Sequence, residues 1–428
     1  MHARTEPKTF GEVFALFARL YRDNGAMGFA RLALTLGSTP TPASRWWLGS
    51  VLLAAGSGLF VLYQLTFFGH SSFNTSSDGV NWGLAISTYV YFALISSGLS
   101  MIAALGTVFG LRQFLPIAKR CTFLAIITLV AGFSVLALEL GNPFRMLWAV
   151  PAGMQVMSPM FWMGVFYAID LVLLIVKFYL MWQEDWDSPL SHTVGIAGFV
   201  AVILASGMLG LVFGSMAMRP MWYGPFTSIY FMLSAALCGA AAVVVAIYMA
   251  YGFNRDAMPE RLRTMASGHD LPMVFASLIG LTLIMFVTRL WVGLWSNLDG
   301  MEGFRALVGT PLFHIELWLG LVLPFFMMLM PSLQTRMRPQ MVAAFLVLGA
   351  MFINRYEFVV GGQLVPMFKG SWANSLVAYV PSATEWALTA MGFGMALAMY
   401  AFGEKLFHLS DLPPHAQAEA AQQKLAAA

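Results

Sequence analysis

Ionisable side chains interrupt several long apolar runs of this chain, and their types suit proton exchange with a bound molecule. Asp170 and Lys177 lie seven residues apart in one run, so they share a helical face about 10 Å apart along its axis. A charged side chain inside lipid is costly, which makes such residues functional candidates by default. A mid-membrane carboxyl with a polar group below it suits a proton path. A structural helix with Lys177 extended to water explains the pair equally well.

Most other polar candidates lie near the ends of their apolar runs, on one side of the predicted membrane. At about 1.5 Å per residue, Glu316 is roughly 5–8 Å from the start of its run at Pro311, whereas Asp170 is about 15 Å deep. Each residue alone could be an interfacial side chain or half of a packing ion pair. Together they predict at least one polar cavity that opens to that side. The residues near this side are His70, Glu139, Asn142, Arg145, Arg289, His314, Glu316, Arg355, Glu357 and Glu385.

The elements that must position these side chains are ten apolar runs of the length that a membrane-spanning helix needs, about 20 residues. The composition agrees, with 59% hydrophobic and 10% charged residues and a mean hydropathy of +0.74, outside the range of soluble proteins. Runs this continuous favour helices over a β-barrel, whose strands alternate. The sequence therefore predicts an all-α polytopic membrane protein. The runs are 46–68, 83–110, 121–138, 160–181, 194–217, 226–251, 271–295, 311–330, 341–359 and 381–402.

A weak internal repeat indicates how these helices are grouped. In residues 139–162 and again in 299–314, an acidic residue and a Phe-Arg pair precede a hydroxyl residue and Pro that open a helix. The hydroxyl-Pro part is a common helix-entry signal, so only part of the match is specific. We expect two related four-helix bundles with one helix added at each end. The expected segments are an amphipathic cytoplasmic N-terminal part (1–45), a ten-helix transmembrane domain (46–403) with bundles at about 83–217 and 226–359, and a cytoplasmic tail (404–428).

The distribution of Lys and Arg predicts the orientation. If the N-terminus is cytoplasmic, that side holds most of the 23 Lys and Arg residues, in agreement with the positive-inside rule. We therefore expect both termini in the cytoplasm and the polar cluster on the opposite side. Topology thereby explains the basic residues, and the net charge of +3 gives no indication of nucleic-acid binding.

The chain lacks the residues that haem and iron–sulfur sites usually need. Its two cysteines, Cys121 and Cys238, lie far apart in apolar runs, whereas an iron–sulfur cluster normally takes four. A haem inside the bundle would need paired His ligands at mid-membrane depth. Of the seven His residues only His70 and His314 lie in or beside a run, both near its outer end. We expect no haem, iron–sulfur cluster or other metal on this chain.

Several stretches resemble the NrfD-like family, the membrane subunits of polysulfide reductase and related enzymes. Residues 139–145 (ELGNPFR) followed by 158–160 (SPM) resemble the family's loop motif. Residues 354–356 (NRY), 361–363 (GGQ) and 379–385 (YVPSATE) are similar to the C-terminal part of its ten-helix branch. That branch includes hydrogenase membrane subunits and the menaquinone reductase (Qrc-type) of sulfate-reducing bacteria. The resemblance covers nearly the whole membrane region.

The resemblance implies a multi-pass subunit of the bacterial inner (cytoplasmic) membrane that binds menaquinone or another quinone. Its implied partners are an extracytoplasmic iron–sulfur (ferredoxin-like) subunit, a molybdopterin-type subunit and a multihaem cytochrome c, with which it exchanges electrons and could translocate protons. Carried onto this chain, the implied quinone site comprises His70, Tyr89, Ser96, Ser97, Glu139, Arg145 and Asp170, of which His70, Glu139 and Asp170 are the proton-exchanging candidates. The expected proton path, whose later members could equally form a structural network, comprises Asp170, Lys177, Arg289, His314, Glu316, Arg355 and Glu385.

A secondary transporter or proton channel is the alternative function, because two related bundles with charged residues in the membrane suit it as well. Such transporters usually interrupt a pair of helices near the midplane, whereas the spans here are expected to be uninterrupted. Gly and Pro instead gather in loops 219–225 and 361–370, together with aromatic residues and Met. These loops could be a docking surface for a partner or an aromatic belt at the membrane interface. Clusters and haem on co-purifying chains would favour the redox subunit, and solute transport in liposomes would favour the transporter.

Overall fold

The computed structural model describes residues 44–76, 79–141, 148, 152–268, 270–366, 376–414 and 416, together with scattered positions between 11 and 25. Every regular element within these residues is helical, and ten helices are long and apolar enough to cross a membrane. The prediction of an all-α polytopic membrane protein is therefore confirmed. Asn142, Arg145 and most of the predicted amphipathic segment lie outside the described residues.

The long helices follow one another in the order that the apolar runs predict, and short helices connect some of them. Pro occupies the first turn of several, where its missing N–H costs no hydrogen bond. The long helices are α2 (Ser44–Phe68), α3 (Leu84–Thr107), α4 (Leu115–Glu139), α6 (Pro159–Trp182), α7 (Pro189–Gly214), α8 (Phe226–Ala250), α10 (Asp270–Trp295), α15 (Met337–Gly361) and α16 (Ala383–Leu406). A composite span consists of α12 (Pro311–His314), η4 (Ile315–Val322) and α13 (Leu323–Leu329). The short helices are η1 (Gly69–Ser72), η2 (Arg112–Phe114), η3 (Arg255–Ala257), α9 (Glu260–Ser267), α11 (Glu302–Val308) and α14 (Pro331–Gln334).

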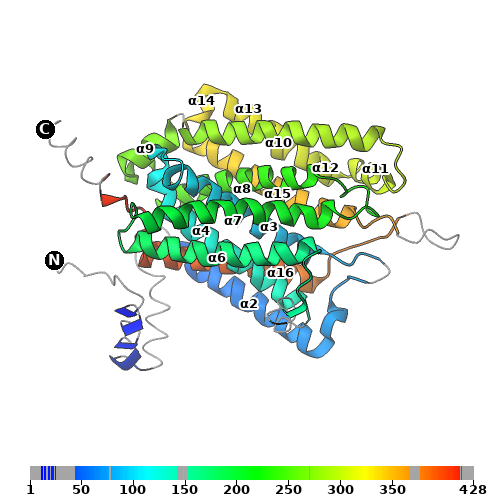
Figure 1. Cartoon of the computed structure of the whole chain (residues 1–428), viewed down its shortest axis with the longest axis horizontal. Helices are drawn as coiled ribbons and strands as arrows, with labels where there is room; N and C mark the ends of the chain where they lie inside the picture. The colour runs from blue at the N-terminus through cyan, green and yellow to red at the C-terminus, as the bar shows by residue number, and fades with distance from the viewer. Residues whose placement is uncertain are drawn as a thin grey trace.

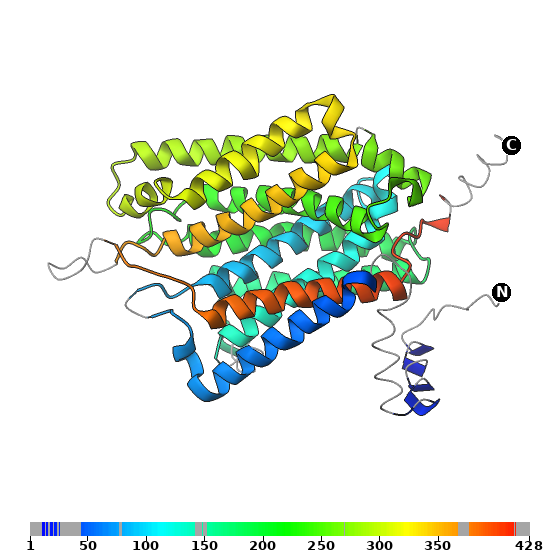
Figure 2. The same ribbon diagram turned by 180° about the vertical axis from the view of Figure 1, so that it is seen from behind.

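Helix α3 lies in the middle of the bundle (Figures 1 and 2). It is buried along most of its length and packs against α4, α7, α8 and α15. Helices α3, α4, α6 and α7 pack against one another, and α8, α10, the composite span and α15 form a second group. Helix α2 pairs with α16 at the edge of the bundle and is mostly exposed. We call the end of the bundle with the start of α2 and the end of α16 the terminal end, and the opposite one the distal end (Figure 1).

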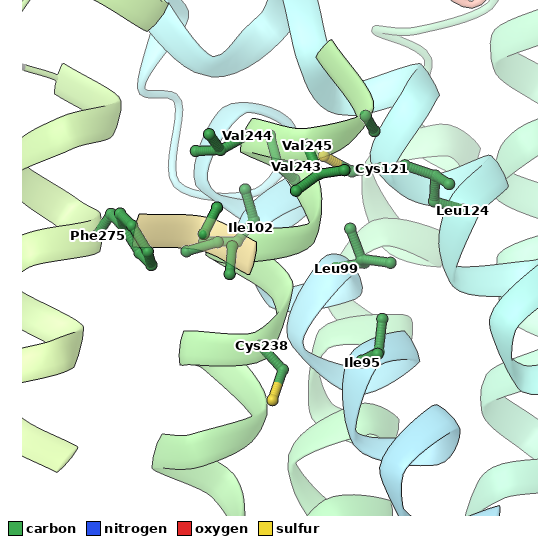
Figure 3. Packing of buried hydrophobic residues seen from close by; sticks show 14 of the residues in the cluster. Ile95, Leu99, Ile102, Cys121, Leu124, Cys238, Val243, Val244, Val245 and Phe275 are labelled. Carbon is green, nitrogen blue, oxygen red and sulfur yellow. The ribbon is translucent and has the colours of Figure 1, made fainter. Parts of the chain in front are cut away.

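The two groups meet where α3 crosses α8. Gly98 of α3 lies against α8 so closely that a Cβ at this position would be 1.8 Å from the carbonyl oxygen of Ala235. A Cβ on Gly239 of α8 would likewise be 2.1 Å from the carbonyl carbon of Gly98. Only glycine therefore fits at this crossing. Beside it, Leu99 and Cys238 belong to the largest hydrophobic core of the molecule (Figure 3).

Helix α4 starts earlier than the apolar run at 121 predicts. Lys119 and Arg120, which the sequence places outside the membrane, lie inside the helix and are buried. Lys119 Nζ is 2.6 Å from Asp411 Oδ2, and Arg120 Nε is 2.7 Å from Glu404 Oε1. Charges can be buried when their counter-charges and hydrogen-bond partners come with them. The prediction missed these partners because they lie nearly 300 residues away, Glu404 in the last turn of α16 and Asp411 just after it.

The span over 311–330 differs from the expectation of an uninterrupted α-helix, because its middle third, η4, is a π-helix. Pro324 lies just after η4 and has no N–H, and its ring would clash with the carbonyl four residues earlier in a regular helix. A locally wider turn relieves this clash, and π-helical turns are frequent at functional sites. Gly320 allows η4 to pack on α15, since a Cβ there would be 2.0 Å from Ala350 Cβ. Glu316 stands in the first turn of η4 and is therefore positioned by this irregularity.

Candidate functional site

A small cavity lies in the second group of helices. Its walls come from α10, α11, α12, η4 and α15, with Met221 from the loop before α8. Near its residues α10 ends, the composite span begins and α15 ends, so the cavity lies toward the distal end (Figure 1). The lining residues are Met221, Phe286, Arg289, Leu290, Phe304, Leu307, Phe313, Glu316, Asn354, Glu357 and Phe358.

Two carboxyl groups and an amide form one polar wall of this cavity. Glu316 is 1% exposed, and its Oε1 accepts a hydrogen bond of 2.7 Å from Asn354 Nδ2. Glu357 Oε1 accepts one of 3.1 Å from the hydroxyl of Thr310, the N-cap of α12. The two carboxyl groups also interact with each other. Neighbouring carboxyl groups in a low-dielectric site do not readily both ionise.

Two arginines lie close to this wall without pairing to it. Arg289 lines the cavity and lies over the ring of Phe358, with its Cζ 4.8 Å from the ring centre. Arg355 is fully buried, donates to Ser234 Oγ of α8 and stacks over Phe231 at 4.6 Å. Among the described residues neither guanidinium comes within 4.0 Å of a carboxylate oxygen. Buried N–H groups of both arginines and the Oδ1 atom of Asn354 have no hydrogen-bond partner.

A second polar site lies in the first group of helices, around Asp170. Asp170 is 0% exposed near the middle of α6, and neither carboxyl oxygen has a hydrogen-bond partner. Tyr167, one turn earlier, is also fully buried, and its hydroxyl lies 3.3 Å from Ser97 Oγ. The Tyr89 hydroxyl points to Met163 Sδ at 3.9 Å on the same helix as Asp170. A buried polar group without a partner is costly, so Asp170 marks this site as unusual.

The remaining first-group candidates have structural partners. Ser96 donates to the carbonyl oxygen of Ala125 at 2.8 Å and so links α3 to α4. Lys177 donates to the carbonyl and hydroxyl oxygens of Ser191, at 2.9 and 2.7 Å, in the first turn of α7. It is buried and makes no ion pair with Asp170 within the part of the chain that the structure describes. The structure thus connects Lys177 to α7 and leaves Asp170 unpaired.

His70 and Glu139 meet at the distal end. His70 is exposed, and its Nε2 lies 2.5 Å from the backbone oxygen of Glu139, the last residue of α4. The structure therefore brings these two predicted residues together, although through the backbone of Glu139 and not its carboxyl. Arg145, the third member of this stretch, is not among the described residues.

The predicted proton-path residues of the second group fall into two sets. Arg289 and Glu316 line the cavity, and Arg355 is next to its lining residue Asn354. His314 is exposed, because it lies two residues before Glu316 and so faces away from the cavity. Glu385 is buried elsewhere, in the N-terminal turn of α16, where it completes a capping box with Ser382.

Asn354 and Glu357 were not among the predicted quinone-site or proton-path residues, although Glu357 was expected on the polar side of the membrane. They lie three residues apart, so they share one face of α15, and both face Glu316 and the cavity. Pro324 was the available signal, because a Pro inside an apolar run marks a helix irregularity that can aim a side chain inward. Loop 219–225 is likewise partly structural: Trp222 is buried and its Nε1 donates to the Phe358 carbonyl oxygen at 2.6 Å. No three His, Cys, Asp or Glu side chains within the described ranges are grouped as a metal site.

Comparisons with known proteins cover both polar sites. Residues 72–367 match the model of a protein family described as polysulphide reductase, NrfD. A selenate reductase subunit of Mesobacillus selenatarsenatis is 24% identical over 378 residues, which cover 76% of this chain and 85% of that protein. A Halobacterium salinarum protein named as a "putative dimethyl sulfoxide reductase membrane subunit" is 22% identical over 397 residues, which cover 81% of this chain and 87% of that protein. Asp170 and the cavity lie within the family match, whereas His70 and Glu385 lie outside it.

Proposed function

The chain belongs to the NrfD polysulphide reductase family, and on that premise we propose that it is the quinone-binding membrane subunit of a respiratory oxidoreductase. The two relatives are named as subunits of reductases, which supports a membrane subunit of a redox complex. In the proposed reaction, electrons pass between an extracytoplasmic iron–sulfur subunit and a membrane quinone such as menaquinone. A quinone that accepts two electrons also takes up two protons and becomes a quinol.

The observation that carries this proposal is the unpartnered carboxyl of Asp170. A carboxyl that is fully buried and accepts no hydrogen bond is much more stable when protonated. A protonated acid inside the membrane can donate its proton to a carbonyl oxygen that becomes reduced, which is the task of a general acid. Asp170 is therefore the proposed proton donor to the quinone.

The surroundings of Asp170 suit this role. Tyr167 and Ser97 form a short buried hydroxyl pair one turn from it, and Tyr89 lies on the neighbouring α3. These hydroxyls can orient a carbonyl oxygen or pass on a proton. We place the quinone ring beside this set, with the iron–sulfur partner at the distal end and, further out, a molybdopterin-type subunit and a multihaem cytochrome c.

Replacing Asp170 by Asn keeps the shape of the side chain and removes its acidic proton. We expect Asp170→Asn to lower quinone-linked electron transfer by about 100-fold or more, the usual effect of losing a general acid. The measurement is turnover of the purified complex with a soluble menaquinone analogue. Asp256→Asn, which alters an exposed carboxyl in η3, is the matched control and should keep normal turnover.

His70→Ala tests the second proton-exchanging candidate in the same assay, with the exposed His192 replaced as its control. Both test variants should still assemble, as judged by co-purification of the partner subunits. Wild-type turnover in Asp170→Asn and in His70→Ala would exclude both residues from the reaction.

A secondary transporter remains the alternative proposal, and one observation favours it. The composite span is interrupted by η4 beside a buried carboxyl, as transporter helices often are. Transporters of this kind use a pair of such helices, whereas within the described residues only this long helix contains a π-helical segment. Purified chain in liposomes that moves a solute without any redox partner would favour the transporter over the quinone-binding subunit.

A further inference from the structure

The cavity between α10, η4 and α15 is separate from Asp170, because α6 is not among the helices that line it. The volume of the cavity that is open to water is about 20 Å³. One water molecule needs about 10–15 Å³ measured in the same way, together with roughly two to four polar partners. The cavity therefore has room for a single ligand of the size of a water molecule.

A hydrogen-bond donor without a partner lies at this cavity. The guanidinium of Arg289 lies over the rings of Phe304 and Phe358, with its Cζ 5.8 and 4.8 Å from their centres, and all three residues line the cavity. Its Nη2 atom is buried and has no acceptor in the part of the chain that the structure describes. An unsatisfied buried N–H costs free energy, so this position favours a ligand that accepts a hydrogen bond.

A hydrogen-bond acceptor without a partner lines the same cavity. Asn354 is 2% exposed, and its Nδ2 donates to Glu316 Oε1 at 2.7 Å. The other end of the amide, Oδ1, is an acceptor, and no donor from the described residues reaches it. The cavity therefore favours a ligand that also donates a hydrogen bond.

We propose that the cavity binds one ordered water molecule, which accepts from Arg289 and donates to Asn354. A metal cation cannot accept from the guanidinium, and a halide cannot donate to the amide oxygen, whereas water does both. The second hydrogen of the water can go to a carboxyl oxygen of Glu316 or Glu357, which complete the polar wall. This set gives about three hydrogen bonds, the usual number for a buried water.

The composition of the walls supports a filled cavity. Cavities that stay dry in proteins are lined by apolar side chains. Phenyl rings line one part of this cavity, but a guanidinium, an amide and two carboxyl groups line the rest. Such groups lose their hydration when the protein folds, and one bound water restores part of it.

The water links three helical segments. Its partners are Arg289 on α10, Glu316 on η4 and Asn354 on α15. Arg289 makes no ion pair with the carboxyl groups of this wall within the described residues, so the water takes the place of a direct contact and joins α10 to the other two segments. This role does not depend on the proposed electron transfer, because the reaction at Asp170 does not use it.

Hydroxyl-radical footprinting of the purified complex tests this water. X-rays split water, and a radical formed from a bound water oxidises the side chain beside it before it diffuses away. We expect Phe286 and Phe313, which are each 5% exposed and line the cavity, to be hydroxylated several times faster than Phe178. Phe178 is the matched control, because it is also 5% exposed but does not line the cavity. Equal rates at the three rings would overturn the proposal.

Asn354→Leu removes the acceptor and keeps a side chain of similar size. Loss of one hydrogen bond weakens the binding of the water about tenfold, so labelling of Phe286 and Phe313 should fall toward that of Phe178. Asn297→Leu, which alters an exposed amide in the loop after α10, should leave the labelling unchanged. Full labelling in Asn354→Leu would mean that water reaches these rings without the proposed site, and would overturn it.

A density map of the wild-type complex decides the question even if Asn354→Leu does not assemble. At a resolution that shows other buried waters, we expect a peak about 2.7–3.2 Å from a guanidinium nitrogen of Arg289 and from Asn354 Oδ1. A map without this peak would overturn the site, and so would a peak that contacts carboxyl oxygens alone, which marks a cation. Quinone turnover is measured separately, so failure of the water site leaves the proposed function standing.

Discussion

Glu385 illustrates how a carboxyl near a predicted membrane surface can serve the fold. Its oxygens accept the backbone N–H of Ser382 at 2.8 Å in the capping box of α16 and that of Leu84 at 3.3 Å at the start of α3. Tyr379 also donates its hydroxyl to Glu385. Burial and this hydrogen bond raise the pKa of Tyr379 above its ordinary value, so the phenol stays protonated and remains a donor. Gly83 is needed beside them, because a Cβ there would be 2.2 Å from the Tyr379 hydroxyl.

Glu385→Gln separates a structural role from a place on a proton path. The amide replaces one acceptor oxygen by a donor that faces N–H groups, so we expect the free energy of unfolding to fall by about 1–3 kcal/mol. Thermal unfolding of the purified complex in detergent measures this, with the exposed Glu260→Gln as control. If stability is unchanged and quinone turnover falls instead, Glu385 belongs to the proton path.

At the residue scale, the sequence predicted the depth of polar side chains along their helices better than it predicted their contacts. Depth along a helix follows from counting, so Asp170 was correctly expected far inside its helix. Facing direction within a short irregular span does not follow as directly, and His314 turned outward while Glu316 turned in. The partners of Glu385 at Leu84 and of Arg120 at Glu404 come from distant segments, and no local spacing reveals such pairs.

At the element scale, the crossing of α3 and α8 is a very close contact between two helix backbones. Small residues let helix backbones approach closely, which is how membrane helices gain packing energy without a hydrophobic driving force. The number and order of the helices were predictable, since hydropathy alone determines them. The crossing was not, because Gly98 and Gly239 are two among 39 glycines and only the packed structure shows which ones meet.

Gly239→Ala tests the crossing. The added Cβ would stand 2.1 Å from the backbone of Gly98, so α3 and α8 must move apart, and overpacking of this kind costs about 1–3 kcal/mol. We expect a lower thermal midpoint and a lower yield of monodisperse protein. Gly349→Ala on α15 is the control, because nothing lies within 4 Å of its Cβ position. Equal midpoints for the two variants would contradict the rigid crossing.

At the scale of the whole molecule, the orientation stays a prediction from the distribution of Lys and Arg. The fold adds where each loop lies: η3, with Asp256, is at the terminal end, and the loop after α10, with Asn297, is at the distal end (Figure 2). The proposed iron–sulfur partner is extracytoplasmic, so it can bind at the distal end only if that end faces away from the cytoplasm. The polar residues near the distal end would then lie close to this partner.

Cysteine labelling measures this orientation directly. We expect Asn297→Cys to react with a membrane-impermeant maleimide added to spheroplasts, and Asp256→Cys to react only after the membrane is opened. The native Cys121 and Cys238 are buried, so they give little background. The reverse pattern would place the distal end in the cytoplasm and exclude an extracytoplasmic partner there.

The crossing of α3 and α8 also has a mechanical consequence for the two polar regions that flank it. Ser97, which contacts Tyr167 near Asp170, precedes Gly98, and Ser234, which holds Arg355, precedes Ala235. Close-packed interiors transmit strain instead of absorbing it, and this joint has no room for a methyl group. We therefore expect a displacement of α3 near Asp170 to be transmitted to α8, the helix whose Ser234 holds Arg355.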